Sequence, residues 1–200
     1  TEIASRVTDI TDRDDSAKAM QYAMNNASAE NDTVRVGSGT YNGSLSVDTG
    51  SLTIEAADGA SPVVTQNSGT VLDINGDDVA VDGLTVEAGD GTTAVDLDDV
   101  SDDAAVTLTD NTIDLTAGNT DSVGIDTGSG SGISETIEDN TFQGSVFDTE
   151  VQEFVDDSGN RVDRNGIVSL IDDNTFEPDV IASVTNLITA VPQEDADVVS

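Results

Sequence analysis

A four-residue motif, Asp-Asn-Thr followed by an apolar residue, constrains the fold of this chain more than any other feature. It occupies positions 110–113, 139–142 and 173–176. A looser copy, VDGLTV at 81–86, has Leu84 in place of the asparagine. Measured at the apolar residue three positions before the asparagine, the copies lie 27, 29 and 34 residues apart. A motif that returns once per coil, with loops of variable length between copies, predicts a solenoid.

Aligning the copies places side chains of one kind above one another. The alignment gives a first apolar column, an asparagine column and a second apolar column: Val81, Leu108, Ile137 and Ile171; Asn111, Asn140 and Asn174; Val86, Ile113, Phe142 and Phe176. Polar residues alternate with the apolar ones, so we expect both apolar columns to stack in the core at the strand spacing of ~4.8 Å. Asparagine tolerates a left-handed backbone and stacked asparagines form hydrogen-bonded ladders. The three asparagines are therefore predicted to be structural corners that turn the chain, with the flanking Asp and Thr outside.

The rest of the chain divides into one helix and many short strands. Residues 14–28 carry Met20, Ala23, Met24 and Ala27 at helical spacing, which predicts an amphipathic helix that lies against another element. From residue 33 the period changes to two, and Gly, Asn, Asp or Ser separates short apolar-polar runs such as TVRV, SLSV, VAVDGLTVEA and TIDL. Such runs are typical of strands with turns between them.

These features resemble the right-handed parallel β-helix proteins of the pectate-lyase-like superfamily. The helix and the following NDTVRVGSGTY (31–41) are similar to the N-terminal entry of many such proteins, where a helix caps the coil. The resemblance implies an all-β fold, a single right-handed parallel β-helix solenoid of about six to seven coils with a short N-terminal capping α-helix. We expect one domain over residues 1–200, divided as follows: capping helix 14–28, coils 33–144, protruding hairpin or loop 145–166, last coils 167–191, acidic tail 192–200.

The charge of the chain excludes several classes of partner. Asp and Glu number 41 against 6 Lys and Arg, a net charge of −35. Nucleic acid is excluded as a partner because binding phosphates requires Lys and Arg.

No cysteine is present, and no apolar run approaches the ~18–20 residues of a membrane span. The composition resembles that of haloarchaeal proteins, and the start at Thr1 suggests a processed extracellular protein or an excerpt.

The residues that the enzymes of this superfamily use for catalysis are largely missing from this sequence. NTDSVGID (119–126) resembles the Asn-Thr-Asp element of its galacturonan hydrolases, but the chain has no histidine and no Arg-Ile-Lys. The lyases use a basic residue as the proton acceptor, and the candidates near the coils are Arg35, Arg161 and Arg164. No aspartate constellation singles one of them out. We therefore expect no catalytic residues and no cofactor.

The sequence also contains candidates for two other kinds of site, a calcium site and glycosylation sites. Turn aspartates offer the oxygen ligands that calcium prefers, with Asp77, Asp78, Asp96 and Asp98 as metal candidates, although none follows a known calcium-loop spacing. Solvated surface aspartates are the favoured interpretation. Three sequons, at Asn26, Asn31 and Asn42, are candidate glycosylation sites.

The function that we expect is that of a non-catalytic, extracellular structural or adhesive protein at the surface of an extreme halophile. It would form a head-to-tail homo-oligomer, such as a filament or lattice, and surface glycans are a second class of partner. The apolar segments near both ends and in the 145–166 excursion supply the interface candidates: Ile3, Val7, Ile10, Phe147, Phe154, Val184, Leu187 and Ile188. The excursion is alternatively a loop that only covers the flank of the solenoid. Alternative functions are a polysaccharide lyase or hydrolase and the receptor-binding spike of a halophilic virus.

Overall fold

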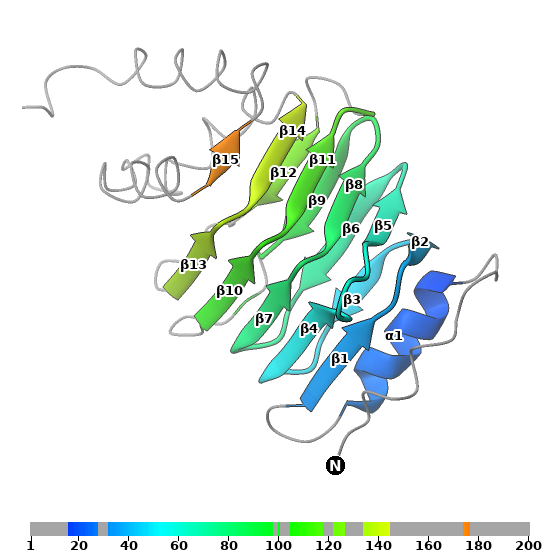
Figure 1. The fold of residues 1–200 in the computed structure, drawn as a ribbon, viewed down its shortest axis with the longest axis vertical. Coiled ribbons are helices and arrows are strands. Elements are labelled where there is room, and N and C mark those ends of the chain that lie inside the picture. The colour runs from blue at the N-terminus through cyan, green and yellow to red at the C-terminus, as the bar shows by residue number, and fades with distance from the viewer. Residues whose placement is uncertain are drawn as a thin grey trace, which may run out of the picture.

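The computed structural model describes residues 16–27, 32–97, 100, 105–117, 122–126, 134–144 and 174–176 (Figure 1). The single helix of this part is α1 (Ser16–Asn26). Its strands are β1 (Asp32–Val36), β2 (Gly39–Asn42), β3 (Leu45–Val47), β4 (Leu52–Ala56), β5 (Pro62–Gln66), β6 (Gly69–Ile74), β7 (Val79–Asp82), β8 (Thr85–Ala88), β9 (Thr92–Asp96), β10 (Ala105–Thr109), β11 (Thr112–Leu115), β12 (Val123–Asp126), β13 (Ser134–Glu138), β14 (Thr141–Gly144) and β15 (Thr175–Phe176).

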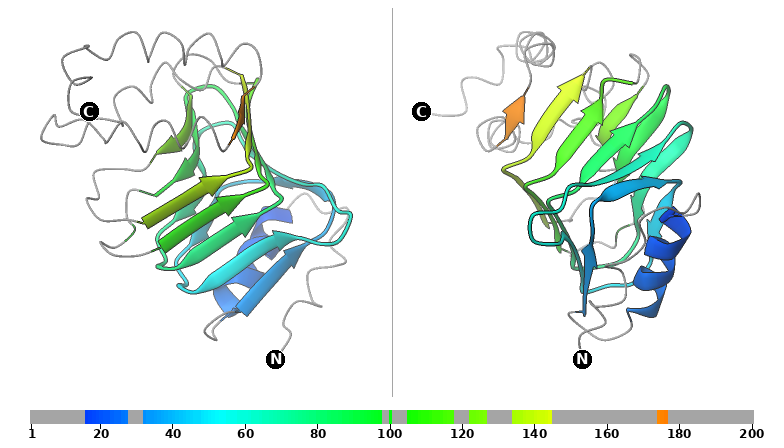
Figure 2. Two further views of the ribbon diagram at one scale, coloured as in Figure 1. Left: turned by 60° about the vertical axis from the view of Figure 1, so that its left-hand side comes forward. Right: turned by 45° about the vertical axis from the view of Figure 1, so that its right-hand side comes forward.

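The strands form three parallel sheets that wind around one core, so the predicted parallel β-solenoid is confirmed (Figures 1 and 2). The first sheet has the order β1-β4-β7-β10-β13, the second β15-β14-β11-β8-β5-β2 and the third β12-β9-β6-β3. Each coil contributes one strand to each sheet, and successive coils pair in parallel. The three coils from β1 to β9 are described without a gap.

The expectation of six to seven coils is not matched. The sheets contain five, six and four strands in the described part of the chain. Because each coil needs three strands and three turns, Ile54, Val81 and Leu108 are paired neighbours although 27 residues separate each from the next. The stretch 33–144 therefore holds fewer coils than its many short strands suggested.

The predicted core columns are confirmed by the strand register. The second apolar column continues upstream of the motif through Val64 and Tyr41, and its register runs Tyr41, Val64, Val86, Ile113, Phe142 and Phe176. Val86, Ile113 and Phe142 are buried. The first column runs Val34, Ile54, Val81, Leu108 and Ile137. Ile171 lies outside the described residues.

The corner residue of the motif is the aspartate, and our assignment of this role to the asparagine was wrong. Asp110 and Asp139 have the left-handed backbone, with φ of 54° and 57°. Gly83, at the same place in the looser copy, has φ of 71°. A short polar side chain or glycine adopts this region at low cost. The asparagine that follows is thereby directed inward, and Asn111 and Asn140 are buried.

The buried asparagines form the predicted ladder between coils. The Oδ1 of Asn140 accepts a hydrogen bond from the backbone N–H of Asn111 at 3.0 Å, and its Nδ2 donates to the carbonyl of Leu108 at 2.8 Å. The Oδ1 of Asn174 accepts from the N–H of Asn140 at 2.9 Å in the same way. At the N-terminal end of the ladder, Leu84 donates its N–H to the Oδ1 of Asn111 at 3.0 Å. Each amide thus satisfies backbone groups that the corner takes out of the sheets.

Helix α1 covers the first coil, as predicted, and within the described residues it spans Ser16–Asn26 (Figure 2). Residues 14, 15 and 28 lie outside the described part. The predicted stripe is buried: Met20 and Met24 are 0% and 1% exposed, and Ala23 and Ala27 also lie in the core. A helix that buries these side chains over the end of a solenoid shields the core from water.

Candidate functional site

The outer faces of the three sheets are the first place where a site would be expected, and they carry regular columns of polar side chains. The register places an uncharged column on the second sheet: Thr40, Val63, Thr85, Thr112, Thr141 and Thr175. The first sheet carries an uncharged column and a mixed one: Thr33, Thr53, Ala80, Thr107 and Thr136; Arg35, Glu55, Asp82, Thr109 and Glu138. Along each strand these residues alternate with buried ones, so the columns lie on the outer faces of the sheets.

One carboxyl group of the mixed column, that of Asp82, has a raised pKa. Partial burial raises the pKa of Asp82 above the ordinary aspartate value, and the negative charges of Asp110 and Glu55 raise it further. No positive charge lies beside Asp82 in the register, where its neighbours are Glu55 and Thr109. The like charges of adjacent coils therefore act on one another at the strand spacing.

The third sheet stacks Asp73, Asp96 and Asp126 in one outward column. Two of the calcium candidates, Asp77 and Asp78, lie in the turn between β6 and β7, while Asp96 lies at the end of β9. The Oδ1 of Asp78 accepts a hydrogen bond from the N–H of Ala105 at 3.2 Å, which ties the turn to the next coil. Among the residues that the structure describes, no three acidic side chains are grouped to hold a metal ion. Asp98 lies outside them.

Of the lyase candidates, only Arg35 lies in the described part of the chain. Arg35 lies on the outer face of β1 and donates its Nε–H to the carboxylate of Glu55 in the next coil. Arg161 and Arg164 lie outside the described residues, as do Asn119 and Asp121 of the NTD element. The one candidate base that can be placed is therefore engaged in an ion pair with Glu55.

Two of the three sequons can be placed. Asn26 is exposed at the end of α1, and its Nδ2 donates to the carbonyl of Tyr22 at 2.7 Å. Asn42 is exposed at the end of β2, where Gly43 has φ of 130° and starts the turn to β3. Asn31 lies outside the described part. Both side chains are thus on the surface, and the Nδ2 of Asn26 already has a hydrogen-bond partner.

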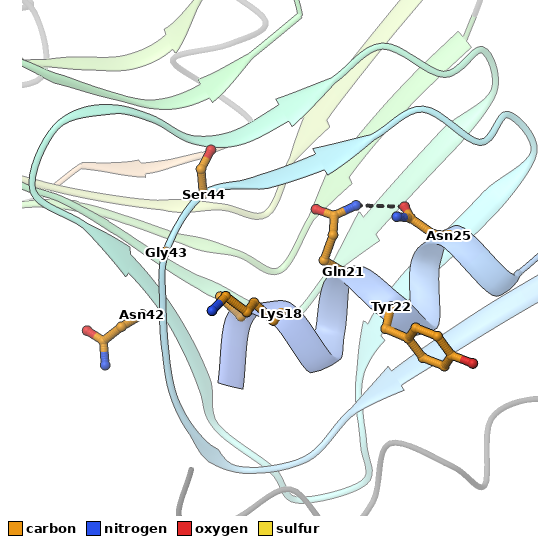
Figure 3. Close-up of a pocket in the computed structure, with 8 residues that line it drawn as sticks. Lys18, Gln21, Tyr22, Asn25, Asn42, Gly43 and Ser44 are labelled. Carbon is orange, nitrogen blue, oxygen red and sulfur yellow. Dashed lines mark hydrogen bonds between the residues drawn. The ribbon is translucent and has the colours of Figure 1, made fainter. Parts of the chain in front are cut away.

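A hollow of ≈ 450 Å³ lies between the outer side of α1 and the β2–β3 turn (Figure 3). We refer to it as the α1 hollow, and its lining residues are Ala17, Lys18, Gln21, Tyr22, Asn25, Asn42, Gly43 and Ser44. The sequence analysis did not single it out, apart from Asn42. A signal was present in Tyr22, which falls off the apolar stripe of the helix and so had to point to solvent.

Gln21 lines the α1 hollow and holds the helix against the solenoid. Its Nε2 donates to the carbonyl of Ser46 and its Oε1 accepts from the N–H of Ser46, both at 2.7 Å. Ser46 is the middle residue of β3, which is the edge strand of the third sheet. The side-chain amide thus pairs with this edge strand as a neighbouring peptide group would.

The interface candidates Ile3, Val7, Ile10, Phe147, Phe154, Val184, Leu187 and Ile188 all lie outside the described residues, together with the 145–166 excursion. In the described part of the chain, α1 is too short and too polar to cross a membrane.

Comparison with known proteins finds no match, since no family model, no curated protein and no solved structure is similar to the chain.

Proposed function

We propose that the chain is a non-catalytic structural and adhesive protein of an extracellular surface, the subunit of an end-to-end assembly of solenoids. The observation that carries this proposal is the set of three parallel ladders that run along one axis. A parallel ladder ends in strand edges that must be covered or joined to another chain. A rod built in this way extends most readily along its own axis.

The first end of the solenoid supports a directional contact. There α1 buries the core and Gln21 pairs with the edge strand β3. In the proposed assembly, this end offers the apolar residues Ile3, Val7 and Ile10 of the segment that precedes α1. The other end offers the stretch VIASVTNLITAV (180–191). Because the two surfaces differ, the contact is head-to-tail and propagates into a filament or lattice.

The outer columns support the halophilic, extracellular part of the proposal. Asp73, Asp96 and Asp126 stack on the third sheet, and Glu55 and Asp82 on the first. Such columns hold water and cations when the salt concentration is high, and repel one another when it is low. We assign the chain on this basis to a haloarchaeal surface, with a glycan on the exposed sequon of Asn26. The motif repeat supports its assignment to the right-handed pectate-lyase-like superfamily.

The alternative of a polysaccharide lyase or hydrolase has weaker support. Its proton acceptor would have to be Arg35, which is paired with Glu55, or an arginine of the 145–166 excursion. The alternative of a viral spike differs in symmetry, because a trimeric spike closes while a head-to-tail assembly does not.

Mass measurement and electron microscopy in high salt separate these functions. The proposal predicts open-ended particles whose length grows with protein concentration. Discrete trimers would favour the viral spike. Incubation with uronate polymers in the same buffer tests catalysis, and the release of unsaturated or reducing-end products would overturn the non-catalytic assignment.

A further inference from the structure

The α1 hollow has a surface chemistry unlike that of the rest of the molecule (Figure 3). None of its eight lining residues is acidic, although 41 of the 200 residues in the chain are Asp or Glu. It also contains Lys18, the single lysine. A neutral polar molecule therefore meets no carboxylate in the lining, whereas the acidic outer columns favour cations and water.

Tyr22 gives the α1 hollow its apolar surface. It is 69% exposed and is the one exposed large hydrophobic side chain in the described part of the chain. The other tyrosine, Tyr41, is buried in the core, and its hydroxyl donates to the carbonyl of Gly37 at 2.9 Å. A tyrosine side chain has an apolar ring and a polar hydroxyl. It is therefore a typical binding surface for a ligand with one apolar face and one polar edge.

Amide and hydroxyl groups also line the α1 hollow, and hydrogen bonds orient Gln21, Asn25 and Ser44. Gln21 is held by Ser46 and donates to the Oδ1 of Asn25 at 2.7 Å, which orients the Asn25 amide with its Nδ2 as donor. Ser44 donates its hydroxyl to the carbonyl of Thr70 at 2.7 Å, so its oxygen retains a lone pair that can accept. Asn42 adds an exposed amide from the turn. The α1 hollow therefore offers both donors and acceptors without a net negative charge.

We infer that the α1 hollow binds a neutral pyranose unit of a surface glycan. The C–H face of the sugar stacks on the ring of Tyr22, and the hydroxyls of the sugar pair with the amide of Asn25, three residues further along the same helix. The volume of ≈ 450 Å³ lies within the ~300–1,000 Å³ typical of small-molecule sites. Because the hollow is open, a single unit binds weakly, with a Kd of about 1 mM. Repeated copies along a filament would strengthen the attachment by avidity.

This inference rests on the adhesive part of the proposed function and is independent of end-to-end assembly. Saturation-transfer NMR in high salt tests it with the unglycosylated full chain and a panel of neutral gluco-, galacto- and manno-oligosaccharides. We expect transfer to the sugar protons and a roughly tenfold weaker binding by Tyr22→Ser, because the stacking contact is lost. Ser68→Ala, an exposed substitution between β5 and β6, is the matched control and should bind as wild type does.

Three results would overturn the inference: no transfer to any neutral sugar, equal binding by Tyr22→Ser, or binding only of uronate oligosaccharides. Circular-dichroism melts should be the same for wild type and Tyr22→Ser, because the ring is exposed, so a loss of binding would not reflect unfolding. Light scattering on the same samples reports assembly separately. A filament that binds no sugar would refute the glycan site and leave the assembly proposal standing.

Discussion

At the scale of single residues, the asparagine ladder is the feature that most strongly joins one coil to the next. Asn140 accepts from the N–H of Asn111 and donates to the carbonyls of Leu108 and Glu138. It is 1% exposed, so water cannot replace these partners. Removing the amide therefore leaves several buried backbone groups without a hydrogen bond.

Asn140→Leu should lower the free energy of unfolding by about 2–3 kcal/mol, because the side chain has a similar size but forms no hydrogen bonds. Urea unfolding in high salt measures the change. Thr141→Val, a substitution on the outer face of the next position, is the control and should change stability by less than about 0.5 kcal/mol. An Asn140→Leu variant as stable as this control would show that the ladder contributes nothing.

The raised pKa of Asp82 makes a prediction about acid conditions. Because the folded protein holds this proton more tightly than the unfolded chain, the contribution of Asp82 to stability is full at low pH and is lost as the pH rises through the folded pKa. Asp82→Asn should therefore stabilise the protein at neutral pH and low salt, but not below the ordinary aspartate pKa of about 3.9.

Urea unfolding of wild type and Asp82→Asn at neutral pH and at about pH 3 measures this difference. Asp58→Asn, in the exposed turn between β4 and β5, is the control for removing one negative charge elsewhere. A benefit of Asp82→Asn that is the same at both pH values, or no greater than that of Asp58→Asn, would contradict the explanation from burial and neighbouring charge.

At the scale of elements, α1 and β3 form the closure of the first coil. Gln21→Leu removes the amide that pairs with both backbone groups of Ser46, while leucine keeps a similar helix propensity. We expect a loss of about 1–3 kcal/mol, because the Ser46 N–H and carbonyl are left partly buried without partners. Chemical unfolding measures it. Asn25→Ala, which removes only the contact to Gln21, should cost less; an equal or greater cost would contradict the closure role of Gln21.

The elements also show what the sequence could and could not predict. The second apolar column was predictable, because Val86, Ile113 and Phe142 recur at fixed offsets from the asparagines. The split of VAVDGLTVEA into β7 and β8 was missed, although its apolar residues move from odd positions (Val79, Val81) to even ones (Leu84, Val86) at Gly83, where the backbone turns left-handed. The strand β2 was also missed, because Gly39 and Asn42 have low strand propensity and only its pairing with β5 holds it extended.

The same limit applies to the corner and to the α1 hollow. Both Asp and Asn tolerate a left-handed backbone, so the pattern alone did not decide between Asp139 and Asn140. The difference lies in burial, which depends on the neighbouring coils. Tyr22 and Asn42 are 20 residues apart in sequence, and only the packing of α1 on the first coil brings them to one hollow.

At the scale of the whole molecule, the net charge of −35 governs stability. Carboxylates of adjacent coils repel one another over ~10 Å at ~0.1 M salt, but over only ~3 Å at ~1 M. The melting temperature should therefore rise strongly between these two salt concentrations, as measured by circular dichroism. Neutral osmolyte at matched osmolality is the control for general exclusion effects. Equal melting temperatures at ~0.1 M and ~1 M would contradict a charge-limited fold.

The proposed assembly is the central claim, and electron microscopy of the native protein in high salt tests it most directly. Wild type should form open-ended filaments or lattices with the solenoid axis along the direction of growth, because the two ends present different surfaces. Deletion of 180–200 should abolish them and leave single solenoids with an unchanged circular-dichroism spectrum over the strand region. Wild-type protein that stays monodisperse and monomeric at high concentration in high salt would contradict the claim.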